Sequence, residues 1–169
     1  MLRIFDKIVR TGRLTEPLPV AGPAIAELGA ACQREIAARF GGSLAIRMVD
    51  AGSCNGCELE MHAVNNGFYD IERFGIHFVA SPRHADLLLV TGPVSRHMQA
   101  ALQRTYEAMP DPKIVIAMGD CAADGGEFGV SYASCGAVAN VVPVDAVIRG
   151  CPPTPLQLLV GILEVLRRY

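Results

Sequence analysis

Two short apolar runs bounded by glycine constrain the fold of this chain more than any other feature. They are ADLLLVTG at residues 85–92 and KIVIAMG at residues 113–119. A continuous apolar character of this kind is typical of strands buried on both faces in a parallel sheet. Between them, SRHMQAALQRTYEAM at residues 95–109 has the pattern of a helix, and Ser95 is a suitable N-cap.

The rest of the chain continues this alternation of strands and helices. Strands are expected at residues 43–50, 75–80 and 146–150, and helices at residues 23–40, roughly 58–65 and 154–169. This order predicts an α/β domain with a parallel sheet and helices on both faces. A chain of 169 residues with 51% hydrophobic content is sufficient for one buried core. We therefore expect a single α/β domain over residues 23–169.

Residues 1–22 are expected to form a short amphipathic helix followed by a linker that contains proline. Apolar residues such as Ile4 and Ile8 fall near one face of this helix, and Lys7 falls on the other. Two interpretations stay open. The helix docks on its own domain, or it docks on a partner or a membrane surface.

Composition excludes several classes of function. The formal charge of −2 and the absence of tryptophan argue against nucleic acid as a partner. The strongly apolar runs are shorter than the roughly 20 residues that a membrane-spanning helix needs, and the N-terminus lacks the apolar core of a signal peptide. These features predict a cytoplasmic protein, in which six cysteines favour metal binding or catalysis over disulfides.

Four of the cysteines follow predicted strands. Cys54 and Cys57 come after the strand that ends near Asp50, Cys121 follows the strand 113–119, and Cys151 follows the strand 146–150. Because the carboxyl ends of parallel strands lie along one edge of a sheet, where open α/β sheets place their ligands, the four thiols are predicted to converge there.

The spacing of these cysteines distinguishes between three kinds of site. Zinc ribbons pair two CxxC knuckles about 15–20 residues apart, whereas a second knuckle is missing here. A thioredoxin-like redox pair would account for Cys54 and Cys57 but leave Cys121 and Cys151 unexplained. The spacing favours an iron–sulfur cluster, and zinc stays open as the alternative. Cys32 is predicted to be a buried structural thiol, and Cys135 is predicted to be either a structural thiol, which is favoured, or a spare thiol near the cluster.

Five blocks of the sequence, in order, resemble a known family. They are SCNGCELEM, YDIERFG, ASPRHADLLLVTGPV, GDCAADGGEFGVSYA and VPVDAVIRGCPPTP. The resemblance as a whole covers about residues 44–168. These blocks are similar to the 20-kDa cluster-bearing subunit of complex I and of energy-converting [NiFe]-hydrogenases. The resemblance implies a flavodoxin-like fold and one [4Fe–4S] cluster, with Cys54, Cys57, Cys121 and Cys151 as its ligands.

The opening motif resembles the hydrogenase branch of this family. Complex I subunits usually have two adjacent cysteines there, whereas this chain has Cys54-Asn55-Gly56-Cys57, as in formate hydrogenlyase and carbon-monoxide-linked types. The resemblance implies an electron-transfer subunit of a membrane-associated complex, peripheral on the cytoplasmic face. Its implied partners are a large subunit with a [NiFe] site, a ferredoxin-like relay and integral membrane subunits. The alternative is the equivalent subunit of an NADH:quinone oxidoreductase, with a quinone site in the partner.

Further residues are candidates for tuning the cluster or contacting a partner. Arg73 and Arg83 are cations, which would stabilise the reduced form of a nearby anionic cluster, although salt bridges are an alternative role. His84 is either a surface residue or a group that faces a quinone-like cavity or a neighbouring subunit. Glu60 is a candidate for passing protons to the large subunit. Arg149 departs from the proline that the family more often has and adds a positive charge beside the cluster.

Overall fold

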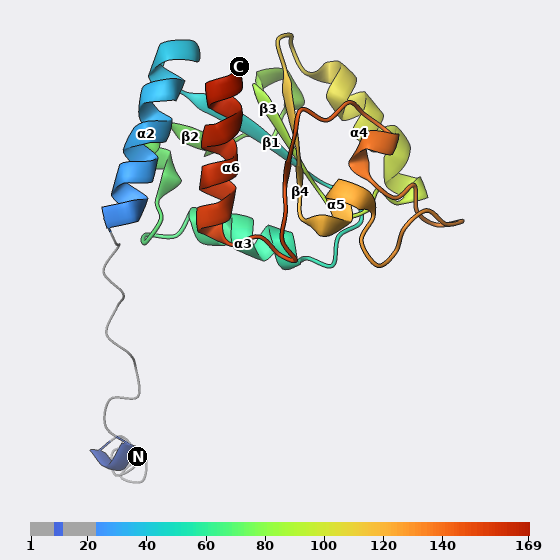
Figure 1. Cartoon of the computed structure of the whole chain (residues 1–169), viewed down its shortest axis with the longest axis horizontal. Coiled ribbons are helices and arrows are strands. Elements are labelled where there is room, and N and C mark those ends of the chain that lie inside the picture. The colour runs from blue at the N-terminus through green and yellow to red at the C-terminus, as the bar shows by residue number, and fades with distance from the viewer. Residues whose placement is uncertain (1–8, 12–22) are drawn as a thin grey trace.

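The computed structural model describes residues 9–11 and 23–169 of the chain. In order, and with η for a 3-10 helix, the elements of residues 23–169 are α2 (Pro23–Arg39), β1 (Leu44–Asp50), α3 (Gly56–Val64), η1 (Ile71–Phe74), β2 (Ile76–Phe78), η2 (Pro82–His84), β3 (Leu87–Thr91), α4 (Arg96–Ala108), β4 (Ile114–Met118), α5 (Asp120–Asp124), η3 (Val138–Asn140), β5 (Ala146–Ile148) and α6 (Pro155–Arg168). Figure 1 shows their arrangement.

The five strands form one parallel sheet in the order β2-β1-β3-β4-β5. This is the strand order of flavodoxin-like folds. The two central strands, β3 and β4, are buried along their whole length, as their apolar sequences predict. After β1 the chain adds β2 on one side, and it then adds β3, β4 and β5 on the other side. The connections from β1 and β3 therefore leave in opposite directions, and ligands are expected between them, at the carboxyl ends of these two strands.

Alternate residues along each strand enter two separate cores. Leu87 and Leu89 of β3 belong to the core that includes α2 and α6. Leu88 and Val90 belong to the opposite core, which includes Leu102 of α4. This period of two is the pattern of a sheet covered on both faces, and burial of each large aliphatic side chain stabilises the fold by about 1.5–3 kcal/mol.

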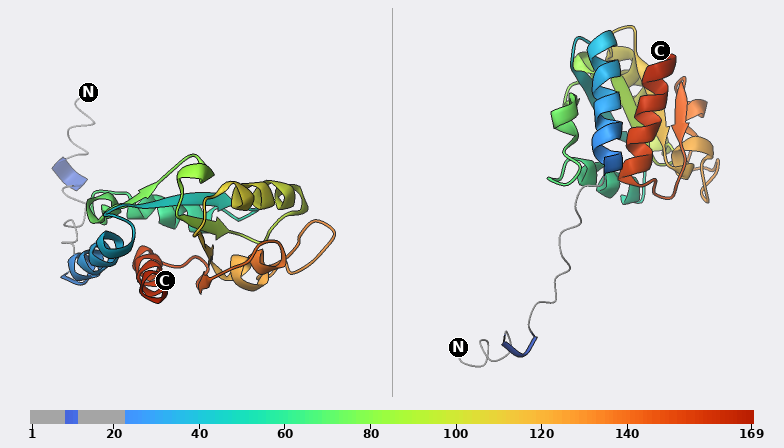
Figure 2. Two further views of the ribbon diagram at one scale, coloured as in Figure 1. Left: turned by 90° about the horizontal axis from the view of Figure 1, so that it is seen from above. Right: turned by 60° about the vertical axis from the view of Figure 1, so that its left-hand side comes forward.

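Helices α2 and α6 lie side by side over one face of the sheet, and α4 lies over the other (Figures 1 and 2). Helix α6 begins at a capping box, in which Thr154 Oγ1 accepts from the Gln157 N–H and the Gln157 side chain accepts from the Thr154 N–H. In the described part of the chain, no helix combines the length and the apolar character needed to cross a bilayer.

The predicted and observed elements differ at the loops that carry cysteines. The helix expected from about residue 58 begins at Gly56, and the segment after β4, expected as a loop, contains helix α5. Cys57 and Cys121 therefore lie in first turns of helices. Of the amphipathic helix predicted within residues 1–22, residues 9–11 are helical, and the rest of that prediction falls on residues outside the described part.

Candidate metal centre

The first two cysteines lie in a tight connection between β1 and α3. The Asp50 carboxylate at the end of β1 accepts hydrogen bonds from the N–H groups of Gly52 and Ser53, each at 2.8 Å. Asn55 then adopts φ 73° immediately before α3 begins. Consequently Cys54 is exposed in the loop, while Cys57 is half-buried in the first helical turn.

Cys121 and Cys151 are held together by the backbone of the next two connections. The Gly119 N–H donates to the Ile148 carbonyl at 2.8 Å, and the Asp120 N–H donates to the Gly150 carbonyl at 2.9 Å. The Asp120 carboxylate accepts in return from the Gly150 N–H at 3.1 Å. These bonds join the start of α5, with Cys121, to the loop that carries Cys151.

The four predicted cysteines line one cavity at the carboxyl edge of the sheet. Its lining consists of these thiols, several glycines and a few polar residues: Ser53, Cys54, Gly56, Cys57, Gly92, Gly119, Asp120, Cys121, Gly150, Cys151 and Pro152. This arrangement agrees with the prediction that thiols from three distant segments converge at one edge of the sheet. The cavity lies where β1, β3, β4 and β5 end and where helices begin.

Two of the lining glycines allow the backbone and the thiols to come close. A Cβ atom at Gly119 would lie 2.7 Å from Cys57 Sγ, and one at Gly92 would lie 2.4 Å from the Ser53 nitrogen. Both residues also have positive φ, of 92° and 73°. Glycine is the residue that adopts such a backbone without strain and leaves the adjacent volume free.

Electrostatics at the cavity favour a cationic partner for the thiols. Burial, followed by the charges of Glu58 and of the other three cysteines, raises the pKa of the Cys57 thiol from 9.0 to about 12. Burial and then the thiolates of Cys151 and Cys54 also raise the pKa of Cys121. Since ionised thiolates repel one another here, a bound metal would offset that repulsion, and the thiolate is the form that binds metal.

Four cysteine thiols are a donor set used both by a tetrahedral zinc ion and by a [4Fe–4S] cluster. Among the described residues, no three His, Cys, Asp or Glu side chains form a group that could hold one metal ion. A tetrahedral zinc site would need its sulfurs about 3.8 Å apart, given a Zn–S distance of about 2.3 Å. A cubane of four irons and four sulfides places its thiolate ligands at the corners of a larger cage.

The other two cysteines lie away from this cavity. Cys32 is fully buried in α2, with its Sγ 3.9 Å from the Leu159 carbonyl oxygen. Cys135 is buried in the opposite core, with its Sγ 3.5 Å from Gln99 Oε1. Their burial agrees with the structural role predicted for them.

Three of the four remaining candidates lie at the other end of the sheet from the cysteines. Arg73 precedes β2 with its guanidinium 4.6 Å from the centre of the Phe74 ring. Arg83 and His84 lie exposed in η2, shortly before β3. These three residues are thus near amino ends of strands, whereas the cysteines follow carboxyl ends. Glu60 lies in α3, half-buried, and none of the four lines the cysteine cavity. Their roles stay predictions.

Glu58 is a site residue whose position sequence reasoning did not anticipate. Its side chain is buried and accepts from the hydroxyls of Ser53 and Thr91. A carboxylate in a first helical turn is usually exposed. The contact with Thr91 depends on the packing of α3 against the end of β3, which no local pattern reveals.

Comparison with known proteins identifies a family and several relatives. The family described as NADH ubiquinone oxidoreductase, 20-kDa subunit, matches residues 54–165. Over 113 residues the chain is 50% identical to formate hydrogenlyase subunit 7 of Escherichia coli. The matched region is 67% of this chain but only 44% of that protein. It is 46% identical over 120 residues to the probable membrane-bound hydrogenase subunit mbhJ of Pyrococcus furiosus, covering 71% of this chain and 72% of the relative.

Solved structures show the same fold. A chain of the archaeal membrane-bound sulfane sulfur reductase, described as a respiratory membrane complex, superposes with a TM-score of 0.65 at 38% identity, over 74% of this chain and 69% of that one. A chain of an NAD⁺-reducing [NiFe]-hydrogenase superposes with a TM-score of 0.53 at 20% identity, over 70% of this chain and 92% of the other.

Proposed function

This chain belongs to the family of the NADH ubiquinone oxidoreductase 20-kDa subunit, and within it we propose an electron-transfer subunit of an energy-converting [NiFe]-hydrogenase-type complex. Cys54, Cys57, Cys121 and Cys151 would together hold one [4Fe–4S] cluster. When bound, such a cluster supplies one-electron transfer to or from the active site of a large partner subunit. Membership of this family makes the chain part of an oxidoreductase complex.

The observation that carries the proposal is the convergence of the four thiols on one cavity. They come from three connections that are far apart in sequence, and the sheet brings them together at its carboxyl edge. The glycines around them leave room beside the sulfurs: a Cβ at Gly119 would lie 2.7 Å from Cys57 Sγ. Four thiols in a small, glycine-lined cavity are the donor set of an iron–sulfur cluster.

The surface around the cavity supports a partner that covers it. Cys54 and Cys151 are exposed, and a nearby loop after α5 exposes large apolar side chains. Phe128, Val130 and Tyr132 are 61%, 68% and 97% exposed, respectively. Apolar side chains clustered at a surface are typical of a protein interface, so we place the large subunit over this edge.

Similarity to the two hydrogenase-complex subunits supports the hydrogenase branch over quinone reduction. Both are 46–50% identical to this chain, and the motif Cys54-Asn55-Gly56-Cys57 favours the same branch. The alternative, supported by the family description, is the equivalent subunit of an NADH:quinone oxidoreductase. In either case we infer a peripheral position on the cytoplasmic face of a membrane, with a ferredoxin-like relay and integral membrane subunits as further partners.

The partner subunit decides between the two functions. A tagged full-length chain, purified anaerobically from its native membranes, should retain a large subunit with two CxxC pairs, stoichiometric nickel and hydrogen-dependent dye reduction. A partner without these cysteine pairs and without nickel, in a complex that reduces quinone, would favour the alternative. Recovery of a chain with zinc and no iron would contradict both.

A further inference from the structure

Glu58 is a charged residue buried beside the candidate cluster site. It directly follows Cys57 in the first turn of α3 and is only 5% exposed. A buried carboxylate needs compensating partners, because the loss of hydration is costly. Its presence next to four thiols, which are themselves anionic when they bind metal, requires an explanation.

The partners of Glu58 are two hydroxyl groups from different segments. Ser53 Oγ donates to Glu58 Oε2 at 2.5 Å, and Thr91 Oγ1 donates to Glu58 Oε1. Thr91 is fully buried at the end of β3. Each carboxyl oxygen thus has one hydroxyl partner. Glu58 therefore connects the cysteine loop to the central sheet.

These bonds form a relayed version of a capping box at the start of α3. In an ordinary capping box, a Glu at the third helical position accepts directly from the N–H of the N-cap residue. Here the Asn55 N–H donates to Ser53 Oγ at 3.0 Å, and the Ser53 hydroxyl donates in turn to Glu58. The relay spans Cys54 and Cys57, so it fixes the segment that carries both thiols.

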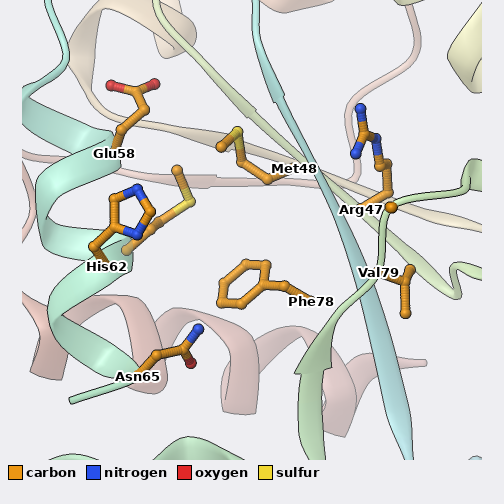
Figure 3. A pocket seen from close by; sticks show the side chains of 9 residues that line it. Arg47, Met48, Glu58, His62, Asn65, Phe78 and Val79 are labelled. Carbon is orange, nitrogen blue, oxygen red and sulfur yellow. The ribbon is translucent and has the colours of Figure 1, made fainter.

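The charge of Glu58 has only neutral hydrogen-bonding partners. Arg47 is a cation that lines the same apolar cavity of about 290 Å³ between α3 and β1. Figure 3 shows its guanidinium across that cavity from the carboxylate. Within the described residues the two form no ion pair, and Arg47 Nε is buried without a hydrogen-bond partner.

From these contacts we propose that Glu58 is a positioning residue for Cys54 and Cys57 and that its charge lowers the reduction potential of the cluster they hold. The inference rests on the proposed function. A cluster gains one negative charge on reduction, so a fixed carboxylate beside it opposes that step. Residues that orient metal ligands typically change metal affinity by about 10- to 100-fold when they are replaced.

The test compares four variants of the anaerobically purified, cluster-loaded chain. Glu58→Gln removes the charge at constant size, and Glu72→Gln is its matched control, because Glu72 is an exposed carboxylate in η1. Thr91→Val removes the hydroxyl donor at nearly constant shape, and Thr91→Ser restores it. Two properties are measured: the midpoint potential in a titration followed by electron paramagnetic resonance, and the rate of iron loss to a chelator.

We expect Glu58→Gln to raise the midpoint potential and to lose iron about 10- to 100-fold faster than the unsubstituted chain. Thr91→Val should also lose iron faster, whereas Thr91→Ser and Glu72→Gln should match the unsubstituted chain. Complete failure of Glu58→Gln to retain iron, with Glu72→Gln loaded, supports the positioning role. An unchanged potential in loaded Glu58→Gln, or equal iron retention in both Thr91 variants, overturns the inference. An unsubstituted chain without iron would instead overturn the proposed function beneath it.

Discussion

Arg149 Nη1 lies 2.5 Å from Asp124 Oδ2, and this ion pair joins the loop that carries Cys151 to the helix that carries Cys121. The same guanidinium lies 3.7 Å from Asp120 Oδ1. The positive charge of Arg149, beside the proposed cluster site, is thus balanced by two carboxylates. Its effect on the cluster is therefore expected to be smaller than that of an unpaired cation.

Replacing Arg149 with Gln should weaken stability at neutral pH but not in acid. The hydrogen bond from Arg149 holds the pKa of Asp124 below its ordinary value of 3.8. A lowered folded-state pKa stabilises the fold above pH 3.8, and this contribution disappears as the pH falls through the lowered value. Because both side chains are exposed, solvent keeps the effect small.

Thermal unfolding at pH 7 and at about pH 2 checks this pKa argument. The difference in midpoint between Arg149→Gln and the unsubstituted chain should be present at pH 7 and absent in acid. Arg104→Gln, at an exposed position of α4, serves as control. A difference that is the same at both pH values would show that Asp124 is not the titrating partner.

Gly119→Ala should impair metal loading. The new Cβ would lie 2.7 Å from Cys57 Sγ, and the backbone has φ 92°, where alanine is strained. Strain of this kind costs about 1–3 kcal/mol, and relief of the clash moves a ligand. Gly67→Ala is the control, since its Cβ meets nothing within 4 Å. Iron per chain after identical reconstitution should fall in Gly119→Ala only; equal iron in both would contradict the proposed crowding.

Gly29→Ala should destabilise the fold although alanine is the better helix former. A Cβ at position 29 of α2 would lie 2.2 Å from a carbon of the Phe74 ring. Overpacking of a core typically costs about 1–3 kcal/mol, which exceeds the roughly 1 kcal/mol that alanine gains over glycine in a helix. Denaturant unfolding measures the result.

The exposed position Ala26 of the same helix supplies a comparison for that experiment. Ala26→Gly should cost about 1 kcal/mol through helix propensity alone. One substitution adds a methyl group to α2 and the other removes one, yet both should lower the free energy of unfolding. An increase in the free energy of unfolding for Gly29→Ala would mean that α2 does not pack on Phe74 as described.

The Cys32 thiol should make stability fall in alkaline solution. Burial raises its pKa from 9.0 to about 11, so the folded chain holds this proton more tightly than the unfolded chain. The stabilisation is complete below pH 9.0 and is lost as the pH rises toward about 11. The free energy of unfolding should therefore decline more in this range for the unsubstituted chain than for Cys32→Ala. Parallel declines would exclude Cys32 as the group responsible.

Much of the fold follows from local sequence patterns. The apolar runs around Leu88 and Ile116 identify buried parallel strands, and the order of elements identifies the sheet. Because parallel strands end at one edge, the positions of Cys54, Cys121 and Cys151 after those strands are sufficient to predict their convergence. The family resemblance then indicates the kind of cofactor, which spacing alone leaves open between iron–sulfur and zinc.

The finer features depend on short elements and on contacts between segments that are distant in sequence. Helix α5 has only five residues, too few for a helical period to be recognised. The bond between Thr91 and Glu58 joins residues 33 positions apart, and the Arg149–Asp124 pair joins residues 25 positions apart. Such pairs follow from the assembled packing, because nothing in either local segment specifies the partner.

The central claim is that four cysteines of this chain hold one [4Fe–4S] cluster. Iron, acid-labile sulfide and the low-temperature paramagnetic spectrum of the reduced, anaerobically purified chain test it most directly. We expect about four irons and four sulfides per chain, retained in Cys135→Ser and lost in Cys121→Ser and Cys151→Ser. Stoichiometric zinc without iron, or a cluster that persists in both of the latter variants, would contradict the claim.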